Sequence, residues 1–178
     1  MTDRQVGPLA RALMHHFEAC KLRAYADPGT GAAPWTIGRG MTYYPDGRKV
    51  KPGDLITSAQ ADAMFDEILA RDFAGPVSAA IGSAATTPAQ FGAMVSLAYN
   101  IGMGPKVWVP GMRKGFRQSE VLKLHRAGQF AGAAAAFGSW TRAAGAVMAG
   151  LVRRRAAEAA LYRSDMAALS RLTAGAVG

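Results

Sequence analysis

Residues 73–105 carry no formal charge in a chain of 178 residues, and this constrains the fold more than any other feature. Thr87 and Pro88 begin a helical pattern inside this segment, with proline at the first helical position, where its missing N–H costs little. The apolar side chains that follow recur at helical spacing and form one stripe: Phe91, Met94, Val95 and Ala98. Such a stripe indicates a helix packed in a protein core rather than a cofactor site. The prolines and amides of the segment interrupt any membrane span.

Further helices are predicted by the same periodicity. The second helix along the chain begins with Thr57 and Gln60, which form the pattern of a capping box. Ser119 is placed to cap the helix expected over residues 120–126. The expected helices cover residues 5–19, 58–74, 120–126, 129–138 and 150–163.

Three segments are expected to interrupt the helices. Gly75 and Pro76 form a helix-breaking pair, with a further helical turn expected over residues 77–81. Residues 103–116 are rich in glycine and proline, which favours a loop or a broken helix. The tail after Asp165 is expected to be frayed.

Residues 35–52 predict a small β-sheet. Pro45, Asp46 and Gly47 form a turn signal between short runs of β-forming residues, which is typical of a hairpin. A sheet of this size is not stable alone, so it must pack against helices. The length of the chain suits one globular domain in two lobes.

The candidate chemistry lies in residues 18–42. Asp27 follows Glu18 by nine residues, and Thr36 follows Asp27 by nine more, with a glycine-rich turn between them. Cleavage of a glycosidic bond needs two carboxyl groups: one protonates the leaving oxygen, and the other activates water or stabilises positive charge on the sugar. Glu18 falls in the last turn of the predicted first helix, where the helix dipole disfavours a carboxylate anion. This position favours a protonated general acid.

Two of these residues also have a purely structural interpretation. Asp27 precedes Pro28 and Gly29, a sequence that often begins a turn. Thr36 lies in a predicted strand, where threonine is common. The spacing, the glycines and the motifs that follow favour the catalytic interpretation.

Three motifs resemble the phage-type lysozymes, the endolysins with which bacteriophages breach the host wall. The first joins Glu18 to Tyr25-x-Asp27 and Thr36-Ile37-Gly38-x-Gly40-x-Thr42. The second, QFGAMVSLAYNIG, covers residues 90–102, and the third, GLVRRRAAE, covers residues 150–158. The first motif departs from the family pattern at Ala19 and Met41 and in a longer turn after Asp27. The resemblance covers residues from about 15 to 163.

The resemblance implies a fold of the α+β class, organised as a single lysozyme-like domain over residues 1–178. A small sheet lobe, at residues about 20–57, would face a larger helical lobe, at about 77–163 together with the N-terminal helix. A linking helix at about 58–74 would join them, and the substrate cleft would lie between the lobes. An arginine of the last predicted helix would reach toward the helix of the catalytic glutamate, and Arg153, Arg154 and Arg155 are the three candidates.

The resemblance also implies a reaction, hydrolysis of the β-1,4 bond between N-acetylmuramic acid and N-acetylglucosamine in peptidoglycan. Glu18 would be the general acid, and Asp27 and Thr36 would position or activate water on the opposite face of the sugar. Asn100, which the resemblance places among the substrate-binding residues, is equally expected to be a helix C-terminal cap. No metal or cofactor is implied, since the histidines show no ligand spacing with carboxylates or cysteine. The implied substrate-binding residues are Thr42, Tyr99 and Asn100.

Two other functions stay open. A lytic transglycosylase cuts the same bond with one glutamate and no water. A non-catalytic protein that binds the wall or nucleic acid could use the same fold, because fold alone does not establish activity. The set of Glu18, Asp27 and Thr36 favours the hydrolase.

The net charge of +9 indicates attraction to polyanions. The basic residues are dispersed apart from residues 153–155, and consecutive helical residues point about 100° apart, so these three cannot all face one partner. The sequence also lacks the interleaved aromatic and basic residues of a nucleic-acid platform. We therefore interpret the charge as affinity for the polyanionic cell wall and expect no nucleic-acid partner.

The expected cellular location follows from the N-terminal sequence. No secretory signal is visible in the first twenty residues. We expect a soluble monomer, made in the host cytoplasm, with no stable membrane insertion. By resemblance, a holin would release it to the wall. Cys20 is the single cysteine, so an intrachain disulfide is excluded, and we expect a small buried residue there.

Overall fold

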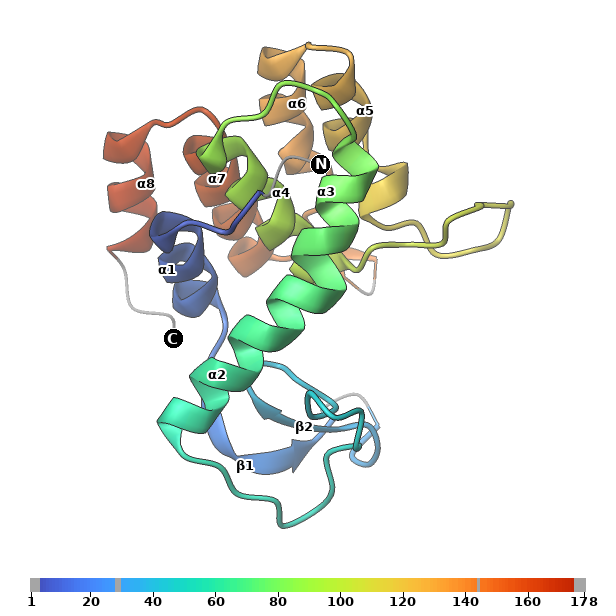
Figure 1. Cartoon of the computed structure of the whole chain (residues 1–178), viewed down its shortest axis with the longest axis vertical. Coiled ribbons are helices and arrows are strands. Elements are labelled where there is room, and N and C mark those ends of the chain that lie inside the picture. Colours follow the sequence, from blue (N-terminus) through green and yellow to red (C-terminus); the bar gives the residue numbers. More distant parts are fainter. Residues whose placement is uncertain (1–3, 28–29, 144, 175–178) are drawn as a thin grey trace.

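A computed structural model describes residues 4–27, 30–143 and 145–174 of the chain. A small sheet lobe and a larger helical lobe are joined by one long helix, which runs from the lower left of the view past the centre toward the upper right (Figure 1). Helices with a small sheet are what the predicted α+β class requires. No described helix is long and apolar enough to cross a membrane.

The sheet lobe is built on two antiparallel strands, β1 (Lys21–Ala26) and β2 (Trp35–Gly38). Tyr25 pairs with Thr36 and Ala26 with Trp35, while an irregularity earlier in β1 shifts the register. The predicted sheet over residues 35–52 is therefore partly wrong, because β2 pairs with the chain before it.

The predicted hairpin around Gly47 contains a real turn but no strands. The Tyr44 N–H donates to the Arg48 carbonyl at 2.8 Å, and the Gly47 N–H donates to the Tyr44 carbonyl at 2.9 Å. Beyond the turn, one isolated bridge joins Tyr43 to Lys49. The positive φ of Gly47, 86°, is a conformation that glycine adopts without strain.

The long helix consists of α2 (Ser58–Ile68), a π-helical segment (Leu69–Ala74) and α3 (Gly75–Ile81). The predicted capping box is confirmed, since Thr57 and Gln60 exchange side-chain hydrogen bonds with each other's backbone. The break predicted at Gly75 and Pro76 is wrong. Pro76 falls in the first turn of α3, where a missing N–H is tolerated, and the wider π turn before it keeps the chain helical.

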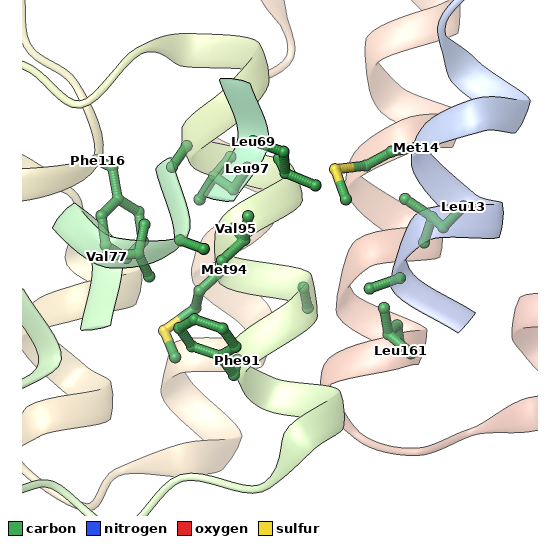
Figure 2. Close-up of a cluster of buried hydrophobic side chains, with 14 of the residues drawn as sticks. Leu13, Met14, Leu69, Val77, Phe91, Met94, Val95, Leu97, Phe116 and Leu161 are labelled. Atoms are coloured by element: carbon green, nitrogen blue, oxygen red, sulfur yellow. The ribbon is translucent and has the colours of Figure 1, made fainter. Parts of the chain in front are cut away.

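The helical lobe packs around α4, in which every residue from 91 to 98 is buried. Helix α4 contacts α1 on one side and α7 on another, and α3 lies against both α4 and α5. Figure 2 shows the resulting cluster, in which apolar side chains of α1, α4 and α7 meet. The helices of this lobe are α1 (Pro8–Phe17), α4 (Pro88–Ile101), α5 (Glu120–Arg126), α6 (Phe130–Ala136), α7 (Ala149–Tyr162) and α8 (Met166–Thr173).

Shorter elements complete the lobe. Two 3₁₀ turns cover Phe116–Gln118 and Phe137–Ser139, and a short hairpin is formed by β3 (Arg142–Ala143) and β4 (Ala146–Val147). The segment 103–116 is a loop up to the first 3₁₀ turn, as predicted.

Two predicted helix boundaries need correction. The first helix, expected over residues 5–19, is shorter at both ends, because Gly7 precedes it and Glu18 already has an extended backbone. The tail after Asp165 is not frayed: Asp165 caps α8 by accepting a hydrogen bond from the Ala168 N–H at 2.9 Å. Buried Leu169 anchors this helix to the core.

Candidate active site

A pocket of about 340 Å³ lies where the two lobes and the long helix meet. The sheet lobe contributes residues 40–43, the long helix contributes Ile68 and Phe73, and α4 contributes Tyr99 and Asn100 near its end. Glu18 lines the pocket together with all three predicted substrate-binding residues: Thr42, Tyr99 and Asn100. Asp27 and Thr36 are not among the residues that line it.

Glu18 lies one residue beyond α1, not in its last turn as predicted. Its backbone is extended, with ψ 107°, and its N–H still donates to the Met14 carbonyl at 2.9 Å. The chain has to leave the helix here because β1 begins at Lys21. The helix end therefore positions Glu18, but the nearest strong electrostatic partner of its carboxylate comes from a distant helix.

That partner is Arg154 of α7. The Arg154 Nη1 donates to Glu18 Oε1 at 2.6 Å, and the two side chains are 4% and 19% exposed. The other carboxylate oxygen, Oε2, lies toward Gly40, since a Cβ on Gly40 would stand 3.7 Å from it. Of the three candidate arginines, Arg154 is thus the one that reaches the glutamate.

Glu158, which is completely buried, connects Arg154 to its neighbour Arg155. Arg154 Nε donates to Glu158 Oε1 at 3.2 Å, and Arg155 Nε forms an ion pair with Glu158 Oε2 at 3.0 Å. The Ser96 hydroxyl of α4 donates to Oε1 at 2.7 Å. One buried carboxylate thus forms ion pairs with two guanidinium groups. Two like charges at this depth need such a counter-charge.

Arg155 carries the network on to Asn100. Its Nη2 donates to Asn100 Oδ1 at 2.8 Å, and the C-terminal cap of α4 is Gly102, not Asn100. The capping alternative for Asn100 is therefore wrong, and its amide is instead fixed in the pocket wall. We refer to Glu18, Arg154, Glu158, Arg155 and Asn100 as the arginine network.

Burial is the largest influence on the pKa values of Glu158 and Arg155. It raises the pKa of Glu158, against the opposing influence of the two arginines and of Ser96. It lowers the pKa of Arg155 to about 10, so the guanidinium still carries its charge at neutral pH. Arg154 and Arg155 are 4% and 1% exposed, so this pair is not available as a surface for nucleic acid.

Tyr99 closes the pocket on the side of the sheet lobe. Its hydroxyl donates to the Arg39 carbonyl at 2.6 Å, which ties the end of α4 to the turn after β2. Burial raises the pKa of Tyr99, and the nearby Glu18 carboxylate adds to this. Gly40 in the same turn has φ 93°, a conformation that favours glycine. Its missing Cβ leaves backbone beside the Glu18 carboxylate.

Thr36 lies in β2, and Asp27 directly follows the end of β1. Thr36 pairs with Tyr25, and the Asp27 N–H, at the start of the following turn, donates to the Ala32 carbonyl at 3.0 Å. Burial raises the pKa of Tyr25, and the charges of Glu18 and Asp27 raise it further, so this ring lies within the field of both carboxylates. Asp27 Oδ1 accepts from the Thr30 N–H at 3.0 Å. Pro28 and Gly29 lie outside the described residues.

Other predicted features have simple outcomes. Cys20 is partly exposed rather than buried. Within the described part of the chain, no group of three or more histidine, cysteine, aspartate or glutamate side chains is arranged to hold a metal ion. Met41, which replaces the usual family histidine, is buried, and its backbone pairs with Ile37 in both directions.

Comparisons with known proteins identify the family of this chain. The family model described as phage lysozyme matches residues 15–158. The chain belongs to the phage lysozyme family. The resemblance inferred from the three motifs is thereby confirmed.

Relatives of this phage lysozyme are endolysins. The chain is 37% identical to an endolysin of Bacillus phage PZA over 90% of its own length, but it spans 55% of that relative. It is 32% identical to an endolysin of Acyrthosiphon pisum secondary endosymbiont phage 1, over 85% of this chain and 93% of the relative. An endolysin structure from Escherichia coli O157:H7 phage FAHEc1 superimposes with a TM-score of 0.76 at 30% identity, covering 92% of this chain and 96% of that one. The α+β lysozyme-like fold is confirmed.

The structure adds two pocket residues, Tyr43 and Phe73, and the buried Glu158, which the sequence analysis did not single out. Tyr43 directly follows the first motif and donates from its hydroxyl to Asp72 at 2.7 Å, so its position was a usable signal. Phe73 lies in the π-helical segment, which no local pattern predicts. Glu158 is part of the third motif, and its spacing of three and four residues from the two arginines indicates ion pairs on one helix face.

Proposed function

We propose that this phage lysozyme is an endolysin that hydrolyses the β-1,4 bond between N-acetylmuramic acid and N-acetylglucosamine in peptidoglycan. The observation that carries the proposal is the Glu18 carboxylate, held by Arg154 in a pocket that also contains Thr42, Tyr99 and Asn100. A glycosidase needs one carboxyl group fixed against the bond to be broken. Residues 1–178 would act as a single lysozyme-like domain.

Glu18 is the proposed general acid. Arg154 binds Oε1, while Oε2 lies on the side of Gly40 and Tyr99, so Oε2 is the oxygen we assign to deliver the proton to the leaving sugar. Tyr99 and Asn100 would bind the sugar, since both are fixed by hydrogen bonds and line the pocket beside Glu18. A fixed wall of this kind lowers the reorganisation needed in the transition state.

Asp27 and Thr36 are proposed to position water on the opposite face of the sugar. The pairing of Thr36 with Tyr25 and the influence of both carboxylates on Tyr25 support this assignment. If water attacks directly, the Glu18 and Asp27 carboxyl groups should stand about 6.5–9.5 Å apart in the substrate complex, and the product should invert. A separation near 5–5.5 Å would indicate a covalent, retaining route.

The partners and location follow from the same proposal. The net charge of +9 would draw the protein to the polyanionic wall. We propose synthesis as a soluble monomer in the host cytoplasm and release to the wall by a holin.

The decisive experiment replaces Glu18 by glutamine, which keeps the shape and removes the transferable proton. Lysis of outer-membrane-permeabilised cells should fall by roughly 10²–10⁴-fold, the usual contribution of general acid catalysis. Glu67→Gln, an exposed position on α2, is the matched control and should lyse cells like the parent protein. Near-parental lysis by a folded Glu18→Gln protein would falsify the assignment.

Product analysis separates the hydrolase from the transglycosylase. Hydrolysis leaves reducing muramic acid ends, whereas a transglycosylase closes the muramic 6-hydroxyl onto its own anomeric carbon and leaves 1,6-anhydro ends that are lighter by one water. Mass spectrometry of digested peptidoglycan should show reducing ends. Dominant anhydro ends would favour the transglycosylase, and undigested peptidoglycan would favour a non-catalytic binding protein.

A further inference from the structure

The proposed reaction leaves one surface feature without a role, the tip of the loop between α4 and α5. We refer to residues 106–114 as the basic tip. Figure 1 shows this loop projecting far from the helical lobe, in yellow and olive at the right of the view. Four large hydrophobic side chains that are exposed among the described residues lie in the basic tip: Val107 (77% exposed), Trp108, Val109 and Met112.

The base of this loop is fixed to the body. The Phe116 N–H donates to the Gly102 carbonyl at 2.9 Å, and the Arg117 N–H donates to the Met103 carbonyl at 3.0 Å. The side chains of Arg117 and Gln118 donate to carbonyls at the start of the loop, at 2.6 Å and 2.8 Å. The projection is therefore built into the fold.

The basic tip also has internal order. The indole N–H of Trp108 donates to the Met112 carbonyl at 3.0 Å, and the Met112 N–H donates to the Val109 carbonyl at 3.1 Å. The ammonium of Lys114 lies 5.1 Å from the centre of the Trp108 ring. The turn thus presents aliphatic side chains outward, while some of its backbone N–H and C=O groups form hydrogen bonds within the turn.

The charge of this region is of one sign. Lys106, Arg113 and Lys114 flank the apolar residues, and the sequence has no acidic residue between Asp72 and Glu120. Exposed aliphatic groups ringed by cations match a surface that offers hydrocarbon beneath a layer of negative charge.

We propose that the basic tip docks on a membrane surface rich in anionic phospholipid. Val107, Val109 and Met112 would enter the boundary between headgroups and acyl chains, and the three cations would contact lipid phosphates. A protein docked in this way would lie on the membrane without spanning it. This docking does not depend on bond cleavage at Glu18.

Other occupants fit the tip less well. A glycan strand is bound by hydrogen-bonding side chains and open aromatic faces, but the single donor of Trp108 is already used and Lys114 lies over its ring. A nucleic acid strand would need the same open ring for stacking. A second copy of the tip would bring like charges together.

Vesicle sedimentation tests the proposal directly. The protein should bind vesicles of phosphatidylcholine with about 30% phosphatidylglycerol far better than phosphatidylcholine alone, because each basic residue near an anionic surface strengthens binding about fivefold. Combined substitution of the tip cations, Lys106→Gln, Arg113→Gln and Lys114→Gln, should weaken binding roughly 100-fold. Glu18→Gln should bind vesicles like the parent protein, so failure of the proposed reaction and failure of docking are distinguishable.

A matched pair of valine substitutions tests the apolar contribution. Val107→Asp should weaken vesicle binding at least about tenfold, because the burial of a valine is lost and a like charge is added. Val147→Asp, at an exposed valine of β4, introduces the same change elsewhere and should bind within about twofold of the parent protein.

Several results would overturn the proposal. Equal binding to both kinds of vesicle, or equal effects of Val107→Asp and Val147→Asp, would show that the tip does not dock on anionic lipid. Loss of binding to purified peptidoglycan by Val107→Asp, with vesicle binding intact, would assign the tip to the wall. A dimer in sedimentation equilibrium that Val107→Asp dissociates would assign it to a second copy.

Discussion

The two sides of the candidate cleft hold their polar groups by different means. On the helical side, Glu18 and Asn100 are bound by two arginines that share the completely buried Glu158. On the sheet side, Thr36 lies in β2, Asp27 directly follows β1, and the Asp27 carboxylate accepts a hydrogen bond from the exposed Thr30 N–H of the following turn. Changes on the helical side should therefore alter both stability and activity, whereas changes on the sheet side should alter activity alone.

The largest effect is expected at the centre of the arginine network. Glu158→Gln keeps the shape of the side chain but leaves Arg154 and Arg155 buried without their shared counter-charge. Removing one partner of a buried ion pair lowers the free energy of unfolding by about 3–5 kcal/mol. Urea unfolding measures this loss, and lysis by the remaining folded protein should fall because Glu18 and Asn100 lose their anchors.

The chain offers a matched control for this change. Glu120 forms an ion pair with Lys123 three residues later, the same spacing as Arg155 and Glu158, but both side chains are more than half exposed. Glu120→Gln should change the unfolding free energy by less than about 1 kcal/mol. Similar losses in the two variants would contradict the idea that burial makes the network important.

The second effect tests the sheet side. Asp27→Asn should reduce peptidoglycan hydrolysis by about 10²-fold, equivalent to about 2.7 kcal/mol in the barrier, because an amide cannot activate water as a carboxylate does. Its unfolding free energy should stay within about 0.5 kcal/mol of the parent value. Turbidity clearing and urea unfolding measure the two quantities on one preparation.

Asp46→Asn is the corresponding control, since Asp46 also accepts a backbone N–H in a turn, from Arg48 at 2.9 Å. It should leave both quantities unchanged. A large loss of stability in Asp27→Asn would mean that the carboxylate is structural, and the water-positioning role would have to be reassigned.

The same contrast explains which parts of the fold the sequence predicts. Thr57 with Gln60 and Thr87 with Gln90 form their capping boxes as local pairs, so local patterns find these helix starts. Pro76 does not break the long helix because the π-helical turn before it, with Leu69 and Ala74 buried, keeps the chain helical, and α8 is ordered because Leu169 is held by the core. Tertiary contacts override local preference at both places.

The candidate site shows the same limit. Glu18, Thr42, Tyr99 and Asn100 could be found from motifs and do lie in one pocket. Which of the three adjacent arginines reaches Glu18 depends on how α7 crosses the end of α1. Arg154 and Glu18 are 136 positions apart in the chain. Periodicity along one helix fixes relative directions but not which direction faces a distant partner.

The third and smallest effect asks whether charge or burial makes the helical side sensitive. His125 of α5 is as buried as Glu158 but belongs to a neutral cluster, with Nδ1 2.6 Å from the Tyr162 hydroxyl and Nε2 2.8 Å from the Thr86 hydroxyl. His125→Gln should lower the unfolding free energy at pH 7 by about 1–2 kcal/mol, because the buried Tyr162 hydroxyl and the partly buried Thr86 hydroxyl lose good partners. This is less than the loss expected for Glu158→Gln.

The pH dependence of this loss has a definite sign. Burial lowers the pKa of His125 below its ordinary value, and Arg4 adds to this, whereas the unfolded chain has a histidine pKa of about 6.5. Below pH 6.5 the unfolded state therefore binds more protons than the folded state, so the stability that neutral His125 contributes is present above this pH and is lost as the pH falls toward the folded pKa. His15, whose pKa is also lowered by burial, contributes with the same sign in both proteins and cancels in their difference.

Urea unfolding of the parent and His125→Gln proteins from pH 7.5 to pH 5 should show that the difference between their unfolding free energies shrinks. A gap that stays constant would mean that His125 does not titrate differently in the folded state, and the neutral cluster would then be an inadequate reference for the arginine network.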